Sequence, residues 1–294
     1  MSLKKDLIRS FREGNLLIKL IYINLIVFVI ANLALVVCHL FQLNTSWMNG
    51  LMLSSNVWQL IFHPWSCITY MFLHMGFVHL ICNVLMLYWF GQLFLLFFQQ
   101  KDLVGVYIFG GLMGGLIYFA AYNIIPYYMS SNGAVLMGAS ASVMAVVVAT
   151  AVMSPEYQVR IPLIGNVKIE WIALATVLIS LLSITSQNAG GELAHLGGAL
   201  AGYLFASRYK KGKNIVAWVN RVIDALANVF RKRKGMRVSY ENEGHSSFDR
   251  MNADMEYNAQ KKQKEEEINR ILEKIKQSGY DSLSSDERAK LFGK

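Results

Sequence analysis

Six apolar segments, each near the length of a membrane-spanning helix, constrain the fold of this chain more than any other feature. A helix needs about 20 apolar residues to cross the hydrocarbon core of a bilayer, where it must satisfy its own backbone polar groups. Apolar residues make up 54% of the chain, and only four prolines interrupt it. We therefore predict an all-α membrane protein built as a bundle of six transmembrane helices. The segments lie near residues 17–40, 67–98, 102–124, 136–153, 168–186 and 192–207.

The positions of the basic residues predict how these segments are oriented. Lys101 follows the second segment, and Arg160 and Lys168 follow the fourth. A basic cluster that starts at Arg208 follows the sixth, whereas the loops after the first, third and fifth segments have no basic residue. Short loops rich in Lys and Arg stay in the cytoplasm. Both termini are therefore expected in the cytoplasm.

Charge also divides the chain into parts. Of its 28 Lys and Arg residues, eight lie in residues 1–207 and twenty in residues 208–294. We predict a cytoplasmic N-terminal segment at residues 1–16, a membrane domain at 17–207 and a basic cytoplasmic tail at 208–294.

The tail is expected to contain segments of different kinds. Residues 214–230 carry apolar side chains at helical spacing and are followed by four consecutive basic residues. This pattern is typical of a helix on an anionic membrane surface, and a partner-binding helix is the alternative. Residues 235–257 are polar and poor in aliphatic side chains, which predicts disorder. Residues 259–277 and 284–292 are predicted to form two short helices.

Polar side chains inside a membrane are costly, so each one is a candidate for function, although a lone one is more often structural. The second, fourth and sixth segments enter from the same side, and each carries such residues near its start. The polar groups can therefore converge at one level of the bilayer. They are His74, His79 and Asn83 in the second segment, Ser140 and Ser142 in the fourth, and His195 in the sixth.

Serine and histidine at one level are the residue types that acyl transfer needs. A Ser140 hydroxyl beside a neutral His195 imidazole could lose its proton as it attacks a carbonyl. His79 and Asn83 are four residues apart, so they share a helix face and could both donate to the developing oxyanion. The small residues from Gly138 leave the Ser140 hydroxyl open and its backbone N–H available as another donor.

Two features around His195 have alternative explanations. Small residues recur at four-residue spacing from Ala194 through Gly198 to Gly202, which lets two helices approach closely, and plain helix packing would explain the same pattern. Glu192 lies three residues before His195 and could orient the imidazole as the third member of a triad. An acidic residue in the first turn of a helix is equally explained by the positive helix end.

These motifs resemble the three signatures of rhomboid proteases. The motifs are His79-x-x-x-Asn83, Gly138-x-Ser140 and the stretch from Ala194 to Gly202, in that order on the second, fourth and sixth segments, and the resemblance covers about residues 55–207. It implies a Ser140–His195 dyad, with the oxyanion bound by Asn83, His79 and the backbone from Gly138 to Ser140. It also implies single-span membrane proteins as substrates, cut near the outer face.

The end of the chain is similar to a short helical motif at the end of some bacterial rhomboids, which implies a bacterial plasma membrane as the location. The sequence departs from the usual rhomboid pattern at Ala141, where glycine is usual, and at Met144, where an aromatic residue is common.

Other functions remain possible alternatives on sequence grounds. A catalytically silent relative would bind and escort membrane helices with the same groove, and a channel or transporter is a third option. The intact Ser140 and His195 disfavour the escort protein, and the lack of paired ionisable residues across the membrane disfavours the transporter. No cofactor, metal or nucleic acid is expected. The expected partners are transmembrane protein substrates and membrane lipids, and the partner of the tail is not identified by the sequence.

Overall fold

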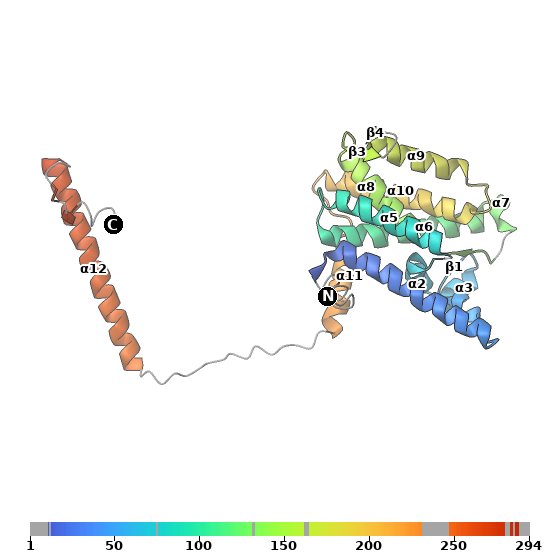
Figure 1. The fold of residues 1–294 in the computed structure, drawn as a ribbon, viewed down its shortest axis with the longest axis horizontal. Coiled ribbons are helices and arrows are strands. Elements are labelled where there is room, and N and C mark those ends of the chain that lie inside the picture. The colour runs from blue at the N-terminus through green and yellow to red at the C-terminus, as the bar shows by residue number, and fades with distance from the viewer. Residues whose placement is uncertain are drawn as a thin grey trace. The chain divides into compact units, whose positions relative to one another are not determined.

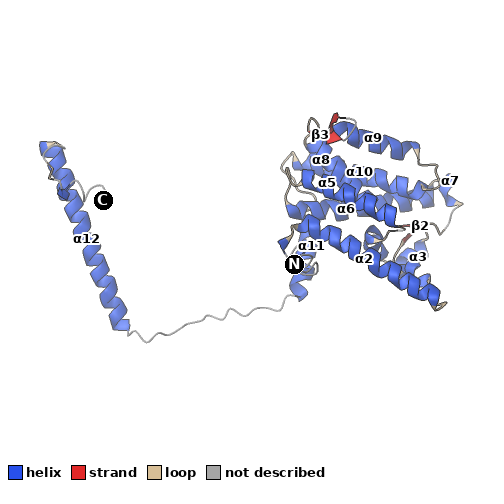
Figure 2. Ribbon diagram, in the orientation of Figure 1, coloured by secondary structure: helices blue, strands red, loops and turns tan. Residues whose placement is uncertain are grey.

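The computed structural model describes residues 11, 13–74, 76–130, 133–161, 165–230, 247–279, 283–284 and 286–287. The chain divides into two compact units, Met1–Lys232 and Arg233–Lys294. Both units are mostly helical in the described residues (Figures 1 and 2). The first unit extends past residue 207, where the charge distribution placed the start of the tail.

Six main helices of the first unit correspond to the six apolar segments. Three of them, α2, α5 and α6, are long and apolar enough to cross a membrane. Helices α8 and α9 are apolar but have only 14 residues each, a rise of about 21 Å against a hydrocarbon core of about 30 Å. The count of six spans therefore stays a prediction. The helices are α2 Leu16–Leu40, α5 Phe77–Phe94, α6 Gln100–Ile124, α8 Ser140–Met153, α9 Ile169–Leu182 and α10 Ala189–Tyr209.

Short elements join these helices, and some of them are strands. Strand β1 (Leu53–Ser54) pairs antiparallel with β2 (Val135–Leu136), and β3 (Gln158–Ile161) pairs antiparallel with β4 (Gly165–Lys168). These short pairs lie in the loops between helices, and the described part of the unit is mostly helical, in keeping with the expected all-α class. The remaining short elements are the 3₁₀ helices η1 Ser46–Gly50 and η2 Tyr70–Phe72, and the helices α3 Val57–Phe62, α4 Ser66–Thr69 and α7 Pro126–Met129.

The apolar segment at 67–98, predicted as one long helix, is broken in the structure. Helix α5 begins only at Phe77, after α4 and η2. The Tyr70 carbonyl accepts from the Gly138 N–H at 2.9 Å, and the Met71 carbonyl accepts from the Tyr107 hydroxyl at 2.9 Å. Because tertiary partners take these carbonyls, the helix does not continue through them.

Glycines bring α10 into backbone contact with its neighbours. A methyl group added at Gly198 would overlap the Ala141 carbonyl oxygen, and one added at Gly202 would overlap the Ala145 carbonyl oxygen. Such close approach is possible only where a side chain is missing. Helix α10 is thereby held directly against α8, which carries Ser140.

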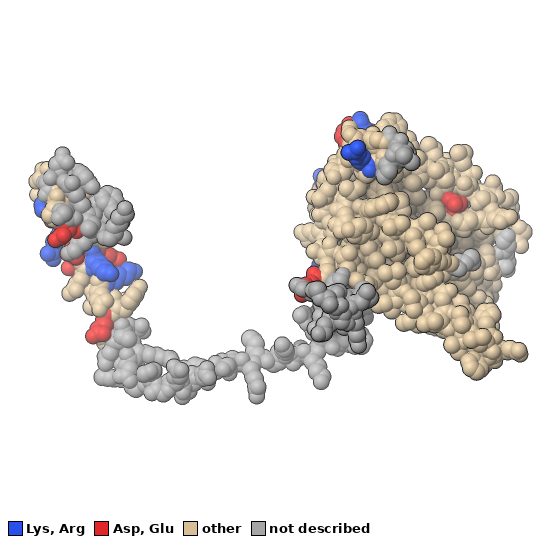
Figure 3. All heavy atoms as spheres, in the orientation of Figure 1, with Lys and Arg blue, Asp and Glu red and all other residues tan. Residues whose placement is uncertain are grey.

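Most charged side chains of this unit lie at one end, and Glu192 near the start of α10 is an exception. The β3–β4 hairpin and α11 (Ala217–Phe230) lie at this end (Figure 1), and the visible surface that extends away from it is almost free of Lys, Arg, Asp and Glu (Figure 3). At the hairpin, Lys168 pairs with Glu156 at 2.6 Å, and near α11, Lys101 pairs with Asp224 at 2.8 Å. An apolar belt with charges beyond it is the distribution that a bilayer selects.

The segment at 214–230 begins against α6. The Asn214 side chain donates to the buried Asp102 carboxylate at 2.6 Å, and Val216 is fully buried, close to Gly105. Whether the apolar side chains later in α11 meet a membrane surface stays a prediction. The start of this helix is part of the first unit.

The second unit contains α12, which runs from Ser247 to Ser278. The prediction of disorder over 235–257 is therefore wrong for residues 247–257, whose helix-forming Met, Ala and Glu residues outweigh the lack of aliphatic ones. Residues 235–246, and most of the helix predicted at 284–292, lie outside the described residues.

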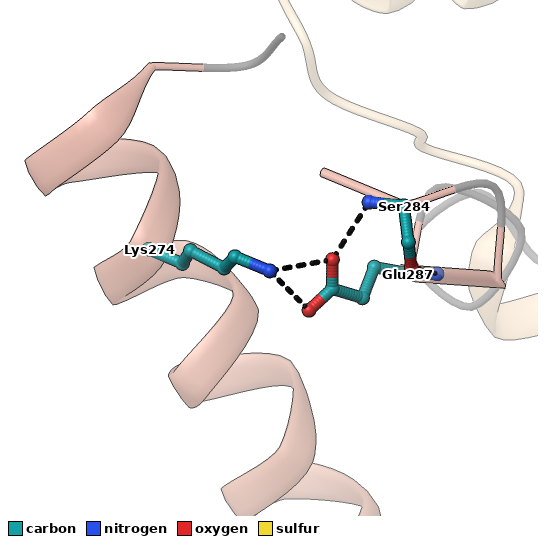
Figure 4. Close-up of polar contacts among 3 residues, drawn as sticks. All are labelled: Lys274, Ser284 and Glu287. Atoms are coloured by element: carbon teal, nitrogen blue, oxygen red, sulfur yellow. Dashed lines mark hydrogen bonds and ion pairs between the residues drawn. The ribbon is translucent and has the colours of Figure 1, made fainter. Parts of the chain in front are cut away.

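Helix α12 contacts a later part of the chain through an ion pair between Lys274 and Glu287. Lys274 Nζ lies 2.9 Å from both carboxylate oxygens of Glu287, which also accepts from the Ser284 N–H at 2.8 Å (Figure 4). The hydrogen bond from Lys274 holds the pKa of Glu287 below its usual range. Both groups are outside the membrane domain, and Ile271 and Leu283 are buried in the same unit.

Candidate active site

One cavity of about 310 Å³ is lined by four of the side chains that the sequence singled out. His79 and Asn83 come from α5, Ser140 from the start of α8, and His195 from the second turn of α10. Most of the remaining lining is apolar and includes Met86, Met137 and Met144. The structure thus brings together residues more than 110 positions apart in the sequence.

The backbone before Ser140 requires glycine. Gly138 has a φ of +133°, a conformation that other residues rarely adopt, and a Cβ at this position would lie 3.0 Å from His79 Cε1. Ser140 is the first residue of α8, so its N–H has no partner within the helix.

One predicted oxyanion donor is engaged elsewhere. The Gly138 N–H donates to the Tyr70 carbonyl at 2.9 Å and is therefore not free to bind an oxyanion in this structure. Gly138 supplies the turn that presents Ser140 and leaves room for the His79 ring. The remaining candidate donors are the Ser140 N–H and the side chains of Asn83 and His79.

Asn83 and His79 lie one turn apart on α5. Asn83 is 7% exposed, and its Nδ2 donates to the His79 carbonyl at 2.9 Å. A side-chain amide has two N–H donors, so one stays available toward the cavity. The His79 ring stands edge-on to the buried ring of His74, with centroids 5.3 Å apart. This contact limits how the His79 ring can turn.

His195 has two neighbours at one ring nitrogen. Its Nδ1 lies 3.2 Å from Glu192 Oε2 and 3.1 Å from Ser180 Oγ. Although Ser140 and His195 are both described and line the same cavity, no hydrogen bond joins them in the structure. In unliganded active sites the hydrogen bond between nucleophile and base is often long and tightens only with substrate.

Ser180 was missed by the sequence reasoning, which looked for polar groups only in the second, fourth and sixth segments. Ser180 lies on α9, in the fifth segment, and is 3% exposed. A serine within a largely apolar span was the available signal, because such a group needs a partner there. The structure supplies His195 as that partner.

Ala141 and Met144, the two residues that differ from the usual rhomboid pattern, both lie close to the candidate site. Ala141 is buried, and its side chain lies close enough to Gly114 that a Cβ on that glycine would be 2.6 Å from the Ala141 methyl. Met144 is one turn after Ser140 and lines the cavity.

No cluster of three or more His, Cys, Asp or Glu side chains that could hold a metal ion occurs among the described residues.

Comparison with known protein families gives two matches. The model of the Rhomboid domain matches residues 62–211, and a family of unknown function, DUF6576, matches residues 251–292. No curated protein and no solved structure matches the chain. The Rhomboid match covers half of the chain and includes all the cavity residues discussed above. With its long apolar helices, the chain is a membrane protein that belongs to the rhomboid family.

Proposed function

We propose that this protein is an intramembrane serine endopeptidase with Ser140 as nucleophile and His195 as general base. The observation that carries the proposal is the single cavity lined by Ser140, His195, His79 and Asn83. It places a hydroxyl, an imidazole and side-chain donors around a space that a peptide bond could enter. These are the parts that acyl transfer requires.

The reaction assigns one role to each group. Ser140 Oγ attacks the carbonyl carbon of the scissile peptide bond while His195 Nε2 takes its proton. The oxyanion that forms is stabilised by the Ser140 N–H, the free Asn83 N–H and His79. His195 then gives the proton to the leaving amine nitrogen as the C–N bond breaks. Water, activated in turn by His195, hydrolyses the acyl ester and restores Ser140.

The surroundings of the cavity support a membrane-embedded substrate. The apolar lining from Met86, Met137 and Met144 suits an apolar side chain beside the cleavage point, since methionine adapts its shape readily. Single-span membrane proteins, cut near the face where α5, α8 and α10 begin, are therefore the proposed substrates. We place the protein in a bacterial plasma membrane, in contact with its lipids and with both termini in the cytoplasm.

An escort protein that binds membrane helices without cutting them is the second candidate. The observation in its favour is that no hydrogen bond joins Ser140 to His195, although both are described and line one cavity. Such a protein would use the same cavity for binding alone. It would therefore tolerate the loss of the Ser140 hydroxyl.

Cleavage of a single-span model substrate by purified protein in liposomes separates the two candidates. Ser140→Ala and His195→Ala should each abolish cleavage, because nucleophile and base act as one unit. Asn83→Ala should lower the rate by about 10²-fold, since other oxyanion donors remain. Ser142→Ala, two residues along the same helix, is the matched control and should keep full activity. Full cleavage by Ser140→Ala would overturn the proposal.

A further inference from the structure

The Nδ1 atom of His195 is held from two directions. Glu192, one turn earlier on α10, approaches it with Oε2 at 3.2 Å, and Ser180 approaches from α9 with Oγ at 3.1 Å. The side chains of His195 and Glu192 are 20% and 15% exposed, and Ser180 is more deeply buried still. Nδ1 therefore lies on the side of the ring that faces protein.

The contact with Glu192 favours one tautomer of the neutral ring. An ionised carboxylate can only accept hydrogen bonds, so a contact with Glu192 requires the proton on Nδ1. In the neutral ring this leaves Nε2 with a free lone pair, the form that a general base needs. Glu192 is on the same helix as His195, whereas Ser180 is on a neighbouring helix. The Ser180 hydroxyl can donate or accept, so its contact fits either tautomer, but together with Glu192 it holds the rotation of the ring from two helices.

The helix N-terminus alone does not explain Glu192. Glu170 is also in the first turn of its helix, α9, where it lies 3.9 Å from Lys168 and its side chain is 36% exposed. That is the ordinary placement of an acidic residue at a positive helix end. Glu192 instead contacts the imidazole, and its side chain is only 15% exposed.

We propose that Ser180 and Glu192 are positioning residues that hold His195 with its proton on Nδ1 and its Nε2 directed to Ser140. This inference rests on the proposed proteolytic function, and neither residue touches the substrate. The two residues act on the orientation and tautomer of the base. Their loss should therefore lower kcat and leave KM nearly unchanged.

The kinetic test uses the full-length protein in liposomes. Glu192→Gln, which keeps the shape but can donate to Nδ1 and so favour the wrong tautomer, should lower kcat about 100-fold. Ser180→Ala should lower it about tenfold, the value of one hydrogen bond. Ser180→Thr keeps the hydroxyl and should restore most of the rate. Glu170→Gln and Ser183→Ala are matched controls without contact to His195 and should match the wild type.

A second readout does not depend on cleavage. Nitrogen-15 NMR of histidine-labelled protein, with His195 assigned by difference from His195→Ala, should report the Nδ1–H tautomer in the wild type. Glu192→Gln should shift it toward a mixture or toward Nε2–H, whereas Ser180→Ala keeps the carboxylate and should retain the Nδ1–H tautomer while lowering kcat. An unchanged tautomer together with unchanged kcat in both variants would overturn the inference. If the wild type cleaves no substrate while the tautomer still shifts, the proposed protease fails and the contact stands as structural only.

Discussion

Helix α10 has two sides that are packed in different ways. Toward α8, its glycines press against the carbonyls of Ala141 and Ala145, so the two backbones touch. Toward α9, contact is made through side chains, and the outer face of α9 is open, with Leu182 82% exposed. His195 lies between these sides, with the cavity and Ser140 on one and Ser180 on the other.

The difference suggests a division of tasks between the two sides. Backbone contact leaves little freedom, so the α8 side fixes the distance between the proposed nucleophile and base. The α9 side holds the ring of the base through one hydroxyl group, which a substitution can remove without moving a helix. Substitutions on the α8 side should therefore act mainly on stability and geometry, and those on the α9 side mainly on the rate.

The largest effect is expected from Gly198→Ala. The added methyl group has no room beside the Ala141 carbonyl, so α8 and α10 must separate. We expect the free energy of unfolding to fall by about 3 kcal/mol and cleavage to be lost. Thermal unfolding in detergent and the liposome assay measure the two. Gly76→Ala is the matched control, because nothing lies within 4 Å of a Cβ at Gly76. A Gly198→Ala protein as stable as the control would show that the interface is looser than described.

A smaller effect of opposite sign is expected from Ser142→Ala. Ser142 is fully buried in α8, and within the described structure its hydroxyl has no hydrogen-bond partner. Removing an unsatisfied buried polar group should raise the free energy of unfolding by about 1 kcal/mol. The same change at Ser180 removes a partnered hydroxyl and should instead slow the reaction. A clear loss of stability in Ser142→Ala would contradict the distinction drawn between these two serines.

The smallest effect is expected from Leu182→Ala at the open end of α9. Its side chain is 82% exposed and lies in no buried cluster. The change should alter the free energy of unfolding by less than about 0.5 kcal/mol and leave the cleavage rate unchanged. Unfolding and cleavage are measured side by side with wild type. A destabilisation near that of Gly198→Ala would mean that the α9 side is as tightly packed as the α8 side.

The sequence predicted most main helices because long apolar runs leave a chain few other structures. It failed where tertiary contacts override a local pattern. Residues 67–76 are largely apolar like the helix that follows, but the carbonyls of Tyr70 and Met71 accept hydrogen bonds from distant groups. The β3–β4 hairpin did carry a signal, since polar and apolar residues alternate from Gln158 to Ile161.

For the candidate site, spacing and residue type were enough to single out Ser140, His195, His79 and Asn83, which line one cavity. They were not enough to decide between the two explanations of Glu192 or to find Ser180. Both depend on the rotation of α9 and α10 about their axes, which apolar helices without a clear polar face do not reveal. The same limit explains Gly138, whose N–H is taken by the Tyr70 carbonyl across the fold.

Labelling of the full-length protein with a fluorophosphonate tests the central claim, the Ser140–His195 pair, most directly. The activated Ser140 Oγ should attack phosphorus and displace fluoride, leaving a stable phosphonate ester. Mass spectrometry of the digested protein should then locate the adduct on the peptide that contains Ser140. The same peptide should stay unmodified in His195→Ala, while Ser142→Ala labels like the wild type. Absence of the adduct from Ser140, or equal labelling of His195→Ala, would contradict the account.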